Sequence, residues 1–491
     1  MGSYHPLPRA AVPVERYKNA VPLQTPMHAQ AIPIPKAKIG LEIHVYVSVE
    51  NRQKLFCTCR IDLAAAPNTT VCPICTAQPG AKPMLPNADA VKKILKAALM
   101  LNCTTNKELV WQRKHYDYPD LPKGYQSTMS GSYAVPVGEK GHFLSIGIRE
   151  CHLEEDPARW DPVTGCVDYN RSGYPLIEIV TEPDFTDASQ VRGWLRKLMT
   201  TLKYVRAVNP EMGVKCDVNV SIAPAFMRVE VKNVNSFTSI IAVIEHEIVR
   251  QQREPVREQH TRAWSEAEQA TKFMRSKEQA LDYMFIPDPD LPVVEVTNGM
   301  LAAIQVELPE KPEEKLKKLL KAGVEKTTAE VIATDLPLSE LFEQLSQSVK
   351  PAFAANWIRK ELLRVMNERD APFDELGLQE KHLLELLELL EAGSVTEQVG
   401  RELLRKLLEK PFSPKQLVKK EGLEAIGGAA ELERLCKDAI AANPGPAADY
   451  LTGKGEALDF LVGQVMKATK GKAKAQEVKG ILGRLLTSTA G

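Results

Sequence analysis

The sequence predicts an α+β protein in which a mixed-sheet domain precedes a helical domain and a small all-helical tail domain. Between residues 39 and about 296, several segments alternate apolar and polar residues with a period of two, as half-buried strands do. Helical segments interrupt these strands without alternating with each of them, which argues against a βαβ fold. After about residue 309, apolar residues recur at three- and four-residue spacing, and almost no segment has a strand pattern.

The first domain contains strand and helix patterns in an irregular order. The predicted strands are "FLSIGIRECHLEED" (143–156), "CDVNVSIAP" (216–224) and "MRVEVKNVNSF" (227–237). The predicted helices are "ADAVKKILKAALML" (88–101), "DASQVRGWLRKLMTTLKYV" (187–205) and "FTSIIAVIEHEIVRQQRE" (237–254). Asp187 is a suitable N-cap for the second helix, because its carboxylate can accept the unpaired backbone N–H groups of the first turn.

Composition shifts along the chain give the domain boundaries. We expect a proline-rich N-terminal arm over 1–38, a first domain over 39–308, a helical domain over 309–410 and a tail domain over 411–491. The arm contains seven prolines and one acidic residue, a composition typical of a surface-draped or mobile segment. The prolines of "IPDPDLPVVEV" (286–296) end the strand-rich region. Amphipathic helices with glycine or proline stops follow, such as "EKHLLELLELLEAG" (380–393).

Composition and charge narrow the classes of function. Lys plus Arg and Asp plus Glu both number 63, so any nucleic-acid-binding surface must be local. No apolar run approaches the roughly 18 residues that span a bilayer, and we expect no membrane partner. Nine cysteines form one tight cluster and a scattered remainder. This pattern favours a reducing compartment, the cytoplasm, and a metal site over a disulfide framework.

Four cysteines lie close together in "LFCTCRIDLAAAPNTTVCPIC". Cys57 and Cys59 form one pair, and Cys72 and Cys75 form a second pair of the C-x-x-C type with Pro73 in its turn. Two turns that approach from opposite sides can supply the four thiolates of a tetrahedral Zn²⁺ site. Such a site has no open coordination position, so we expect it to serve stability rather than chemistry. The alternative is two unrelated pairs of thiols.

A second candidate metal site is rich in oxygen ligands. In "GLEIHV", Glu42 and His44 project from the same face if the segment is a strand. In "CHLEEDPARW", the same rule places three side chains on one face: His152, Glu154 and Asp156. Glu155 then faces away. Carboxylates with an imidazole suit Mg²⁺ or Mn²⁺, although solvated strand faces are the alternative, and the residues alone do not pair the two segments.

Several loops are candidates for phosphate or nucleotide binding. Lys123 and Gly124 follow Pro122 in "RKHYDYPDLPKGYQ", which suggests a turn with exposed backbone N–H groups. Arg171 precedes an apolar strand in "VDYNRSGYPLIEIVTEPD". In "MRSKEQALDY", Arg275 and Lys277 flank Ser276 as a possible helix N-cap. For each segment taken alone, an ordinary charged loop is the favoured interpretation, and the common ATP-binding motifs, such as the P-loop, are absent.

The C-terminal segment is basic. From Met466 to Gly491, six Lys or Arg residues accompany one Glu. A solvated helix face and a phosphate-binding surface are equally good readings of this pattern. The candidate residues for contact with a phosphate backbone are Lys467, Lys470, Lys472 and Lys474.

Taken together, these motifs resemble the B component of the tRNA-dependent amidotransferases, enzymes that act on aspartyl-tRNA(Asn) and glutamyl-tRNA(Gln). The resemblance rests on "GLEIHV", the cysteine cluster, "YPDLPKGYQ", "HLEED", "VDYNRSGYPLIEIVTEPD", "CDVNVS", "VEVKNVNSF", "MRSKE", "PDPDLP" and "LVGQVMKATKGKA". These motifs occur in order from about residue 38 to the C-terminus. The insertion "DPARWDPVTG" is similar to that of archaeal members.

The resemblance implies a cradle-shaped first domain that phosphorylates the side-chain carboxylate of the misacylated amino acid with ATP. An acyl phosphate can expel phosphate when ammonia attacks, whereas a carboxylate would have to expel oxide. The resemblance implies two partner proteins, the glutaminase or A component and the small C component, with misacylated tRNA as substrate. A tRNA-binding scaffold with a degraded activating site, or a phosphotransferase unconnected to tRNA, are the competing interpretations.

Carried over by motif, the resemblance assigns roles to individual residues. Glu42, His44 and Glu154 match the magnesium site, with Glu155 as the alternative glutamate. The four clustered cysteines match the zinc ligands, and the resemblance implies that the four tail lysines bind tRNA phosphates. Candidate ATP-binding positions within the matching motifs are Lys123, Arg171, Lys232 and Arg275.

Overall fold

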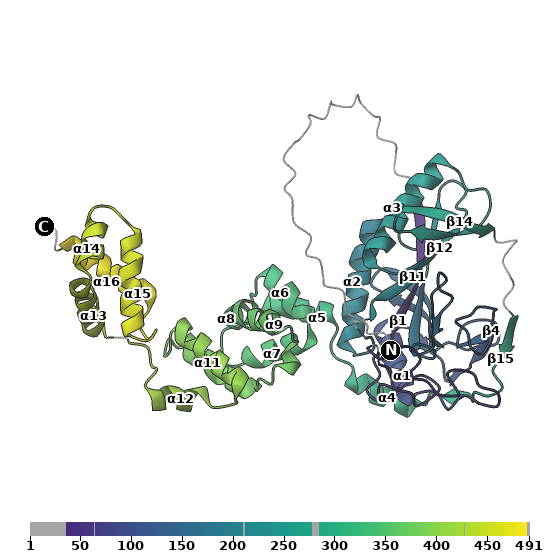
Figure 1. Cartoon of the computed structure of the whole chain (residues 1–491), viewed down its shortest axis with the longest axis horizontal. Coiled ribbons are helices and arrows are strands. Elements are labelled where there is room, and N and C mark those ends of the chain that lie inside the picture. Colours follow the sequence, from purple (N-terminus) through teal and green to yellow (C-terminus); the bar gives the residue numbers. More distant parts are fainter. Residues whose placement is uncertain (1–35, 63, 210–211, 277–283, 427, 489–491) are drawn as a thin grey trace, which may run out of the picture.

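A computed structural model describes residues 36–488 except 63, 210–211, 277–283 and 427. Its first part is built around a sheet, and two groups of helices follow along the longest axis of the molecule (Figure 1). The predicted α+β class is confirmed. Most of the predicted N-terminal arm lies outside the described residues. No helix in the described ranges combines the length and apolar character that crossing a bilayer requires.

Among the described residues, twelve strands form one mixed sheet. The main path runs in the order β14-β13-β12-β11-β1-β10-β7-β5-β4-β15, and β6 joins β2 to β7. β12 and β13 pair in parallel, while the other pairs are antiparallel. The strands are β1 (Ala37–Tyr46), β2 (Thr104–Thr105), β4 (Gln112–His115), β5 (Tyr125–Thr128), β6 (Gly138–Phe143), β7 (Ile146–Glu155), β10 (Pro175–Thr181), β11 (Val214–Ile222), β12 (Val229–Val234), β13 (His260–Ser265), β14 (Ala270–Ser276) and β15 (Met284–Pro287). Two short pairs lie outside this sheet: β3 (Glu108–Leu109) with β16 (Val294–Glu295), and β8 (Arg159–Trp160) with β9 (Val167–Asp168).

Strand β1 shows how the sequence divides the sheet into two faces. Its alternate residues Ile39, Leu41, Ile43 and Val45 are completely or almost completely buried in the main hydrophobic core. Because successive side chains of a strand point to opposite faces, the intervening Glu42 and His44 project from the other side of the sheet. One face therefore supplies the core, and the other is left for polar side chains.

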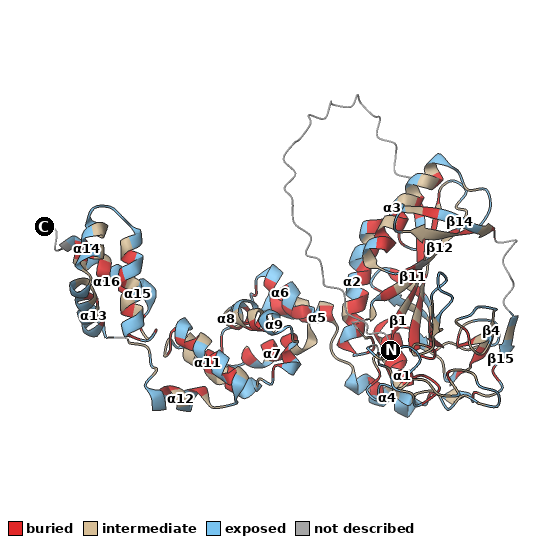
Figure 2. Cartoon of the chain, in the orientation of Figure 1, coloured by how far each residue is buried: buried red, intermediate tan, exposed pale blue. Residues whose placement is uncertain are grey.

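Helices cover the apolar face of the sheet. They are α1 (Ala88–Met100), α2 (Ala188–Tyr204) and α3 (Phe237–Arg253), and their buried residues belong to the same core as the strands (Figure 2). All three lie where the hydrophobic periodicity predicts them. The predicted N-cap of α2 is confirmed, because the Asp187 carboxylate accepts the backbone N–H of Gln190 at 2.9 Å.

After β16 the described residues form helices and no further strands. Two hydrophobic clusters, separate from the core of the sheet domain, lie among the helices that follow α4. Helix α4 (Asn298–Glu307) still contributes Ile304 to the core of the sheet domain. The second cluster lies among α5 (Pro312–Lys321), α6 (Lys326–Ala333), α7 (Leu336–Leu345), α8 (Pro351–Trp357), the π-helical segment Ile358–Leu362, α9 (Leu363–Arg369), α10 (Glu380–Glu391), α11 (Glu397–Glu409) and α12 (Pro414–Glu421). The third lies among α13 (Ala429–Ala442), α14 (Pro444–Leu451), α15 (Glu456–Ala468) and α16 (Ala475–Ser488).

The last helical group contacts the second one through the turn between α15 and α16. The hydroxyl of Thr396, at the start of α11, donates to the carbonyl of Gly471 at 2.5 Å. The Lys472 ammonium donates to the carbonyl of Gly422 at 3.2 Å, where α12 ends. Gly471 has a φ of +75°, and a Cβ there would lie 2.6 Å from the Gln398 side chain. A side chain at position 471 would therefore disturb this contact.

Candidate active site and zinc site

The polar face of the sheet brings acidic and imidazole side chains together from adjacent strands. His44 on β1 lies opposite Glu178 on β10, and Glu178 lies opposite His152 on β7. On the other side of β1, Glu42 lies opposite Asp217 on β11. Directly opposed residues of antiparallel strands project from the same face, so these side chains form one continuous polar surface.

The first cluster on this face consists of His44, Glu154 and Glu178. The Nε2 atom of His44 lies 3.4 Å from Glu154 Oε1 and 3.3 Å from Glu178 Oε2. Burial alone would lower the pKa of His44, but Glu178 and Glu154 together raise it to about 10. The surrounding carboxylates therefore strongly favour a positive charge at this position. The nitrogen and both carboxylate oxygens lie within 4.8 Å of one another.

His152 contacts this cluster through Glu178. Its side chain is completely buried, and its Nε2 atom lies 3.0 Å from the same Glu178 oxygen that faces His44. Burial would raise the pKa of Glu178, but the two imidazoles hold that pKa well below its usual range. The pKa of Glu154 is raised by burial and by the negative charge of Glu178. Glu178 is thus the ionised centre of the cluster.

A second acidic cluster, formed by Glu42, Asp217 and Glu230, lies next to the first. Burial raises the pKa of Glu42, and the negative charges of Glu178 and Asp217 raise it further, which shows that the two clusters affect each other. Two side-chain cations already compensate this second cluster. Lys232 Nζ lies 2.7 Å from Asp217 and 2.9 Å from Glu230, and Arg228 lies 3.4 Å from Glu42.

The donor atoms of the first cluster fit a hard divalent cation. Two carboxylates and one imidazole nitrogen are a ligand set that Mg²⁺ or Mn²⁺ accepts. The sequence hypothesis groups Glu42 and His44 with Glu154, and the structure separates them into adjacent clusters on one face. Glu42 belongs to the second cluster, and Glu178 is the third ligand candidate beside His44 and Glu154.

Asp156 connects the edge of this face to Arg171. Its buried carboxylate accepts from the Tyr46 hydroxyl at 2.9 Å and lies 3.3 Å from Lys215 Nζ. Arg171 Nε lies 2.8 Å from the same carboxylate, and the Arg171 guanidinium also donates to the carbonyl of Ala158 at 3.0 Å. Arg171 is therefore a fixed cation near the polar face and not a free loop residue.

The four clustered cysteines converge as the sequence predicts. Cys75 Sγ lies 3.9 Å from Cys72 Sγ and 4.0 Å from Cys59 Sγ, and all four sulfur atoms lie within 4.8 Å of one another. Thiolates 2.3 Å from a tetrahedral zinc ion are about 3.8 Å apart, so the arrangement fits this metal. A hydrogen bond from Cys57 and the charge of Lys54 lower the pKa of Cys75 to about 4, which favours a thiolate.

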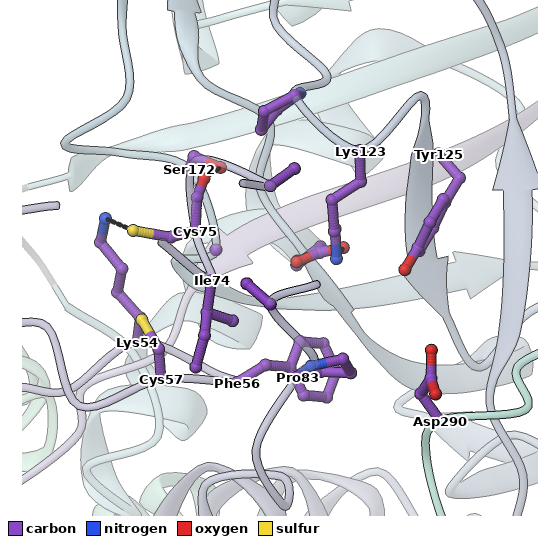
Figure 3. Close-up of a pocket in the computed structure, with 15 residues that line it drawn as sticks. Lys54, Phe56, Cys57, Ile74, Cys75, Pro83, Lys123, Tyr125, Ser172 and Asp290 are labelled. Atoms are coloured by element: carbon purple, nitrogen blue, oxygen red, sulfur yellow. Dashed lines mark hydrogen bonds and ion pairs between the residues drawn. The ribbon is translucent and has the colours of Figure 1, made fainter. Parts of the chain in front are cut away.

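A cavity of about 230 Å³ separates the cysteine cluster from Lys123 (Figure 3). Cys57, Cys75 and Lys54 line one side, while Lys123 and Glu155 line the other. Glu155 forms an ion pair with Lys123. Glu154 thus faces the acidic cluster and Glu155 faces the cavity, because successive side chains of a strand point to opposite sides.

Two segments that the sequence suggests for phosphate binding lie among the described residues, the second of them only in part. Gly124 has a φ of +70°, but its N–H donates to the carbonyl of Leu121 at 3.0 Å, so this turn does not expose it to a ligand. Arg275 and Ser276 end strand β14, and the helix for which Ser276 is the possible N-cap lies, with Lys277, outside the described residues. Arg275 is consequently at the far edge of the sheet, with β13 between its strand and β12.

The four predicted tRNA-binding lysines have different environments. Lys467 and Lys470 are exposed at the end of α15 and in the following turn. Lys472 donates to the backbone of Gly422, and Lys474 lies 3.3 Å from Glu477 at the start of α16. Lys467 and Lys470 are therefore better placed than the other two to meet a phosphate group.

Sequence reasoning missed Glu178, Asp217 and Glu230 as site residues. A weak signal was present, because each of them interrupts an apolar strand: "LIEIV", "CDVNV" and "VEVK". The alternation places each residue on the polar face of its own strand. It does not reveal which strands are neighbours, and that pairing is what makes them a cluster.

Comparisons with known proteins match most of the chain. A family model described as the GatB/GatE catalytic domain matches residues 37–302, and a second, described as the GatB domain, matches residues 340–486. A protein of Methanococcus aeolicus is 42% identical over 91% of this chain and 98% of its own length. Proteins of Methanocaldococcus jannaschii and Methanothermobacter thermautotrophicus are each 41% identical, over 91% and 89% of this chain and over 97% and 98% of their own lengths. All three are named as the B component of an aspartyl/glutamyl-tRNA(Asn/Gln) amidotransferase.

Proposed function

Because the chain belongs to the GatB family, the B component of the aspartyl/glutamyl-tRNA(Asn/Gln) amidotransferases, we propose that the polar face of its sheet activates the aminoacyl side chain of a misacylated tRNA. In this function, ATP phosphorylates the side-chain carboxylate of Asp-tRNA(Asn), Glu-tRNA(Gln) or both. Ammonia then displaces the phosphate and forms the amide. The complex is thus a ligase that forms a carbon–nitrogen bond with glutamine as the amide donor.

The observation that carries the proposal is the pair of acidic clusters on adjacent strands. His44, Glu154 and Glu178 would hold Mg²⁺, which when bound supplies positive charge for phosphate oxygens. Transfer of a phosphoryl group requires such charge more than it requires covalent chemistry. Lys232 and Arg228 lie on the same face and can orient phosphate oxygens once they exchange their carboxylate partners for a nucleotide.

The other predicted groups have supporting roles in this proposal. Four thiolates would hold a structural zinc ion, which fits their spacing. Arg171 stands beside the polar face as a further candidate ATP contact, whereas Arg275 is at the far edge of the sheet and Lys123 faces the cavity. The exposed lysines at the end of α15 would contact tRNA phosphates. A glutaminase, the A component, would supply ammonia, and the small C component would complete the assembly, in the cytoplasm.

The test is amidation by the complex reconstituted with its partner proteins. We expect ATP- and glutamine-dependent conversion of at least one of Asp-tRNA(Asn) and Glu-tRNA(Gln), and its loss in Glu154→Gln. Glu182 provides a matched control, because it is an exposed glutamate just beyond the end of β10 and pairs with Arg149 at 3.1 Å. A wild-type complex that amidates neither tRNA, or a fully active Glu154→Gln variant, would exclude the proposed function.

A further inference from the structure

Lys54 is a buried lysine whose position calls for an explanation. Lys54 is 1% exposed, and no carboxylate of the described residues forms an ion pair with its ammonium. Its ammonium instead donates to Cys75 Sγ at 3.4 Å (Figure 3). The same ammonium donates to the carbonyl of Tyr169 at 3.1 Å. A buried ammonium is costly unless a negative charge compensates it. The thiolate cluster is the only partner of that kind among its contacts in the described structure.

The charges of Lys54 and the metal cluster complement each other. Zinc with four thiolates carries two net negative charges, and these charges also need compensation away from water. Cys75 receives this compensation from the Lys54 ammonium and from the backbone N–H of Cys72, at 3.2 Å. Hydrogen bonds of this kind to metal ligands fix their orientation and tune the affinity for the metal.

The second contact of Lys54 leads to the turn formed by residues 169–174, here called the Arg171 turn. On the side of the cysteine cluster, the Ser172 hydroxyl donates to the carbonyl of Cys75 at 3.0 Å. The stem of Lys54 passes beneath Gly173, where a Cβ would lie 3.8 Å from Lys54 Cβ and Cδ. Gly173 has a φ of +82°, which favours glycine, so the turn keeps this backbone conformation while it packs against the stem of Lys54.

The opposite side of the same turn reaches the candidate magnesium site. Arg171 is held by Asp156 at 2.8 Å, and Asp156 also contacts Tyr46 and Lys215. Lys215 lies directly opposite His44 in the sheet. A continuous set of contacts therefore runs from the thiolates through Lys54 and the Arg171 turn to the polar face.

We propose that Lys54 is a positioning residue that neutralises the zinc–thiolate cluster and uses it to fix the Arg171 turn beside the site of phosphorylation. The zinc cluster then contributes to catalysis through geometry, although it has no open coordination position. The neutralising role stands on the contacts of Lys54 alone, and the link to phosphorylation rests on the function proposed above.

The experiment uses the full chain in its reconstituted complex and compares Lys54→Met with the matched control Lys93→Met. Lys93, on helix α1, is similarly buried, at 4% exposed, but its ammonium pairs with the Glu50 carboxylate. Lys54→Met should lose zinc to a competing chelator at about 10- to 100-fold lower chelator concentration and raise the KM for ATP about tenfold. Lys93→Met should change neither, and Lys54→Arg should recover part of both losses because it restores the charge.

Two further measurements keep the proposal testable if Lys54→Met does not fold. Ser172→Ala removes only the hydroxyl donor to Cys75 and should also raise the KM for ATP. In cobalt-substituted protein, Lys54→Arg should shift the sulfur-to-metal charge-transfer band, since the donor to Cys75 has changed. Unchanged zinc retention in Lys54→Met, or weakened zinc retention with an unchanged KM for ATP, would overturn the proposal. Chelator competition needs no turnover, so failure of the proposed function would appear separately, as an inactive wild-type complex.

Discussion

Replacing Glu178 by glutamine tests the one member of the His44, Glu154 and Glu178 cluster that sequence reasoning missed. The substitution keeps the shape of the side chain but removes the carboxylate charge that faces both His44, at 3.3 Å, and His152, at 3.0 Å. If this cluster holds Mg²⁺, the variant should require more Mg²⁺ for activity. Its fold should survive, because glutamine can still accept a hydrogen bond from a neutral imidazole.

The size of the effect follows from the charges and the spacing. A divalent cation about 4 Å from one carboxylate gains about 8 kcal/mol at an effective relative permittivity of 20. The glutamine oxygen and water replace most of this interaction, and we expect a net loss of about 3 kcal/mol. That loss corresponds to a roughly 100-fold higher Mg²⁺ concentration at half-maximal rate.

The assay is a Mg²⁺ titration of ADP release by the reconstituted complex with misacylated tRNA. Glu178→Gln should shift the midpoint upward by about two orders of magnitude and approach the wild-type rate at high Mg²⁺. Glu182→Gln, which changes an exposed glutamate near the end of β10, should follow the wild-type curve. A Glu178→Gln midpoint equal to that of the wild type would show that this carboxylate does not contact the ion.

Three further predictions follow from the same structure. Cys72→Ser should release zinc and lower the Tm by about 10 °C, measured by metal analysis and calorimetry, and a zinc-free variant of unchanged Tm would contradict the zinc site. Lys232→Met should lower kcat/KM for ATP by at least about 10-fold because it removes a cation from the polar face, whereas equal kinetics would remove Lys232 from the site. The double variant Lys467→Ala/Lys470→Ala should raise the KM for charged tRNA and reduce the salt dependence of binding by about one to two phosphate contacts, with kcat unchanged. A loss of kcat at unchanged tRNA affinity would place these lysines in catalysis instead.

Local patterns predicted much of the fold because burial repeats with the period of each element. The apolar residues of β1 and the Asp187 cap of α2 follow directly from spacing and hydrogen-bonding chemistry. Strand β14, which ends at Ser276, is not among the predicted strands. Its residues Phe273 and Met274 are both exposed, so no alternation of apolar and polar positions marks it as a strand.

The candidate site was less predictable than the fold because it depends on pairing between distant segments. The C-x-x-C turn is local, so its metal-binding chemistry can be read from spacing alone. Glu178 becomes a partner of His44 only through the register of β10 against β1. In the same way, Asp217 becomes a neighbour of Glu42 only because β11 pairs with β1, which lies far from it in the sequence. Periodicity fixes the face of each residue, and only tertiary structure fixes its neighbour.

The most direct test of the central claim is transfer of labelled γ-phosphate from ATP to misacylated tRNA without an amide donor. If the polar face activates the side-chain carboxylate, the wild-type complex should form an acid-stable but hydroxylamine-sensitive phosphate on the aminoacyl group, and Glu154→Gln should not. Full amidation activity without any phosphate transfer to the aminoacyl group, or equal transfer by Glu154→Gln, would contradict this account of the site.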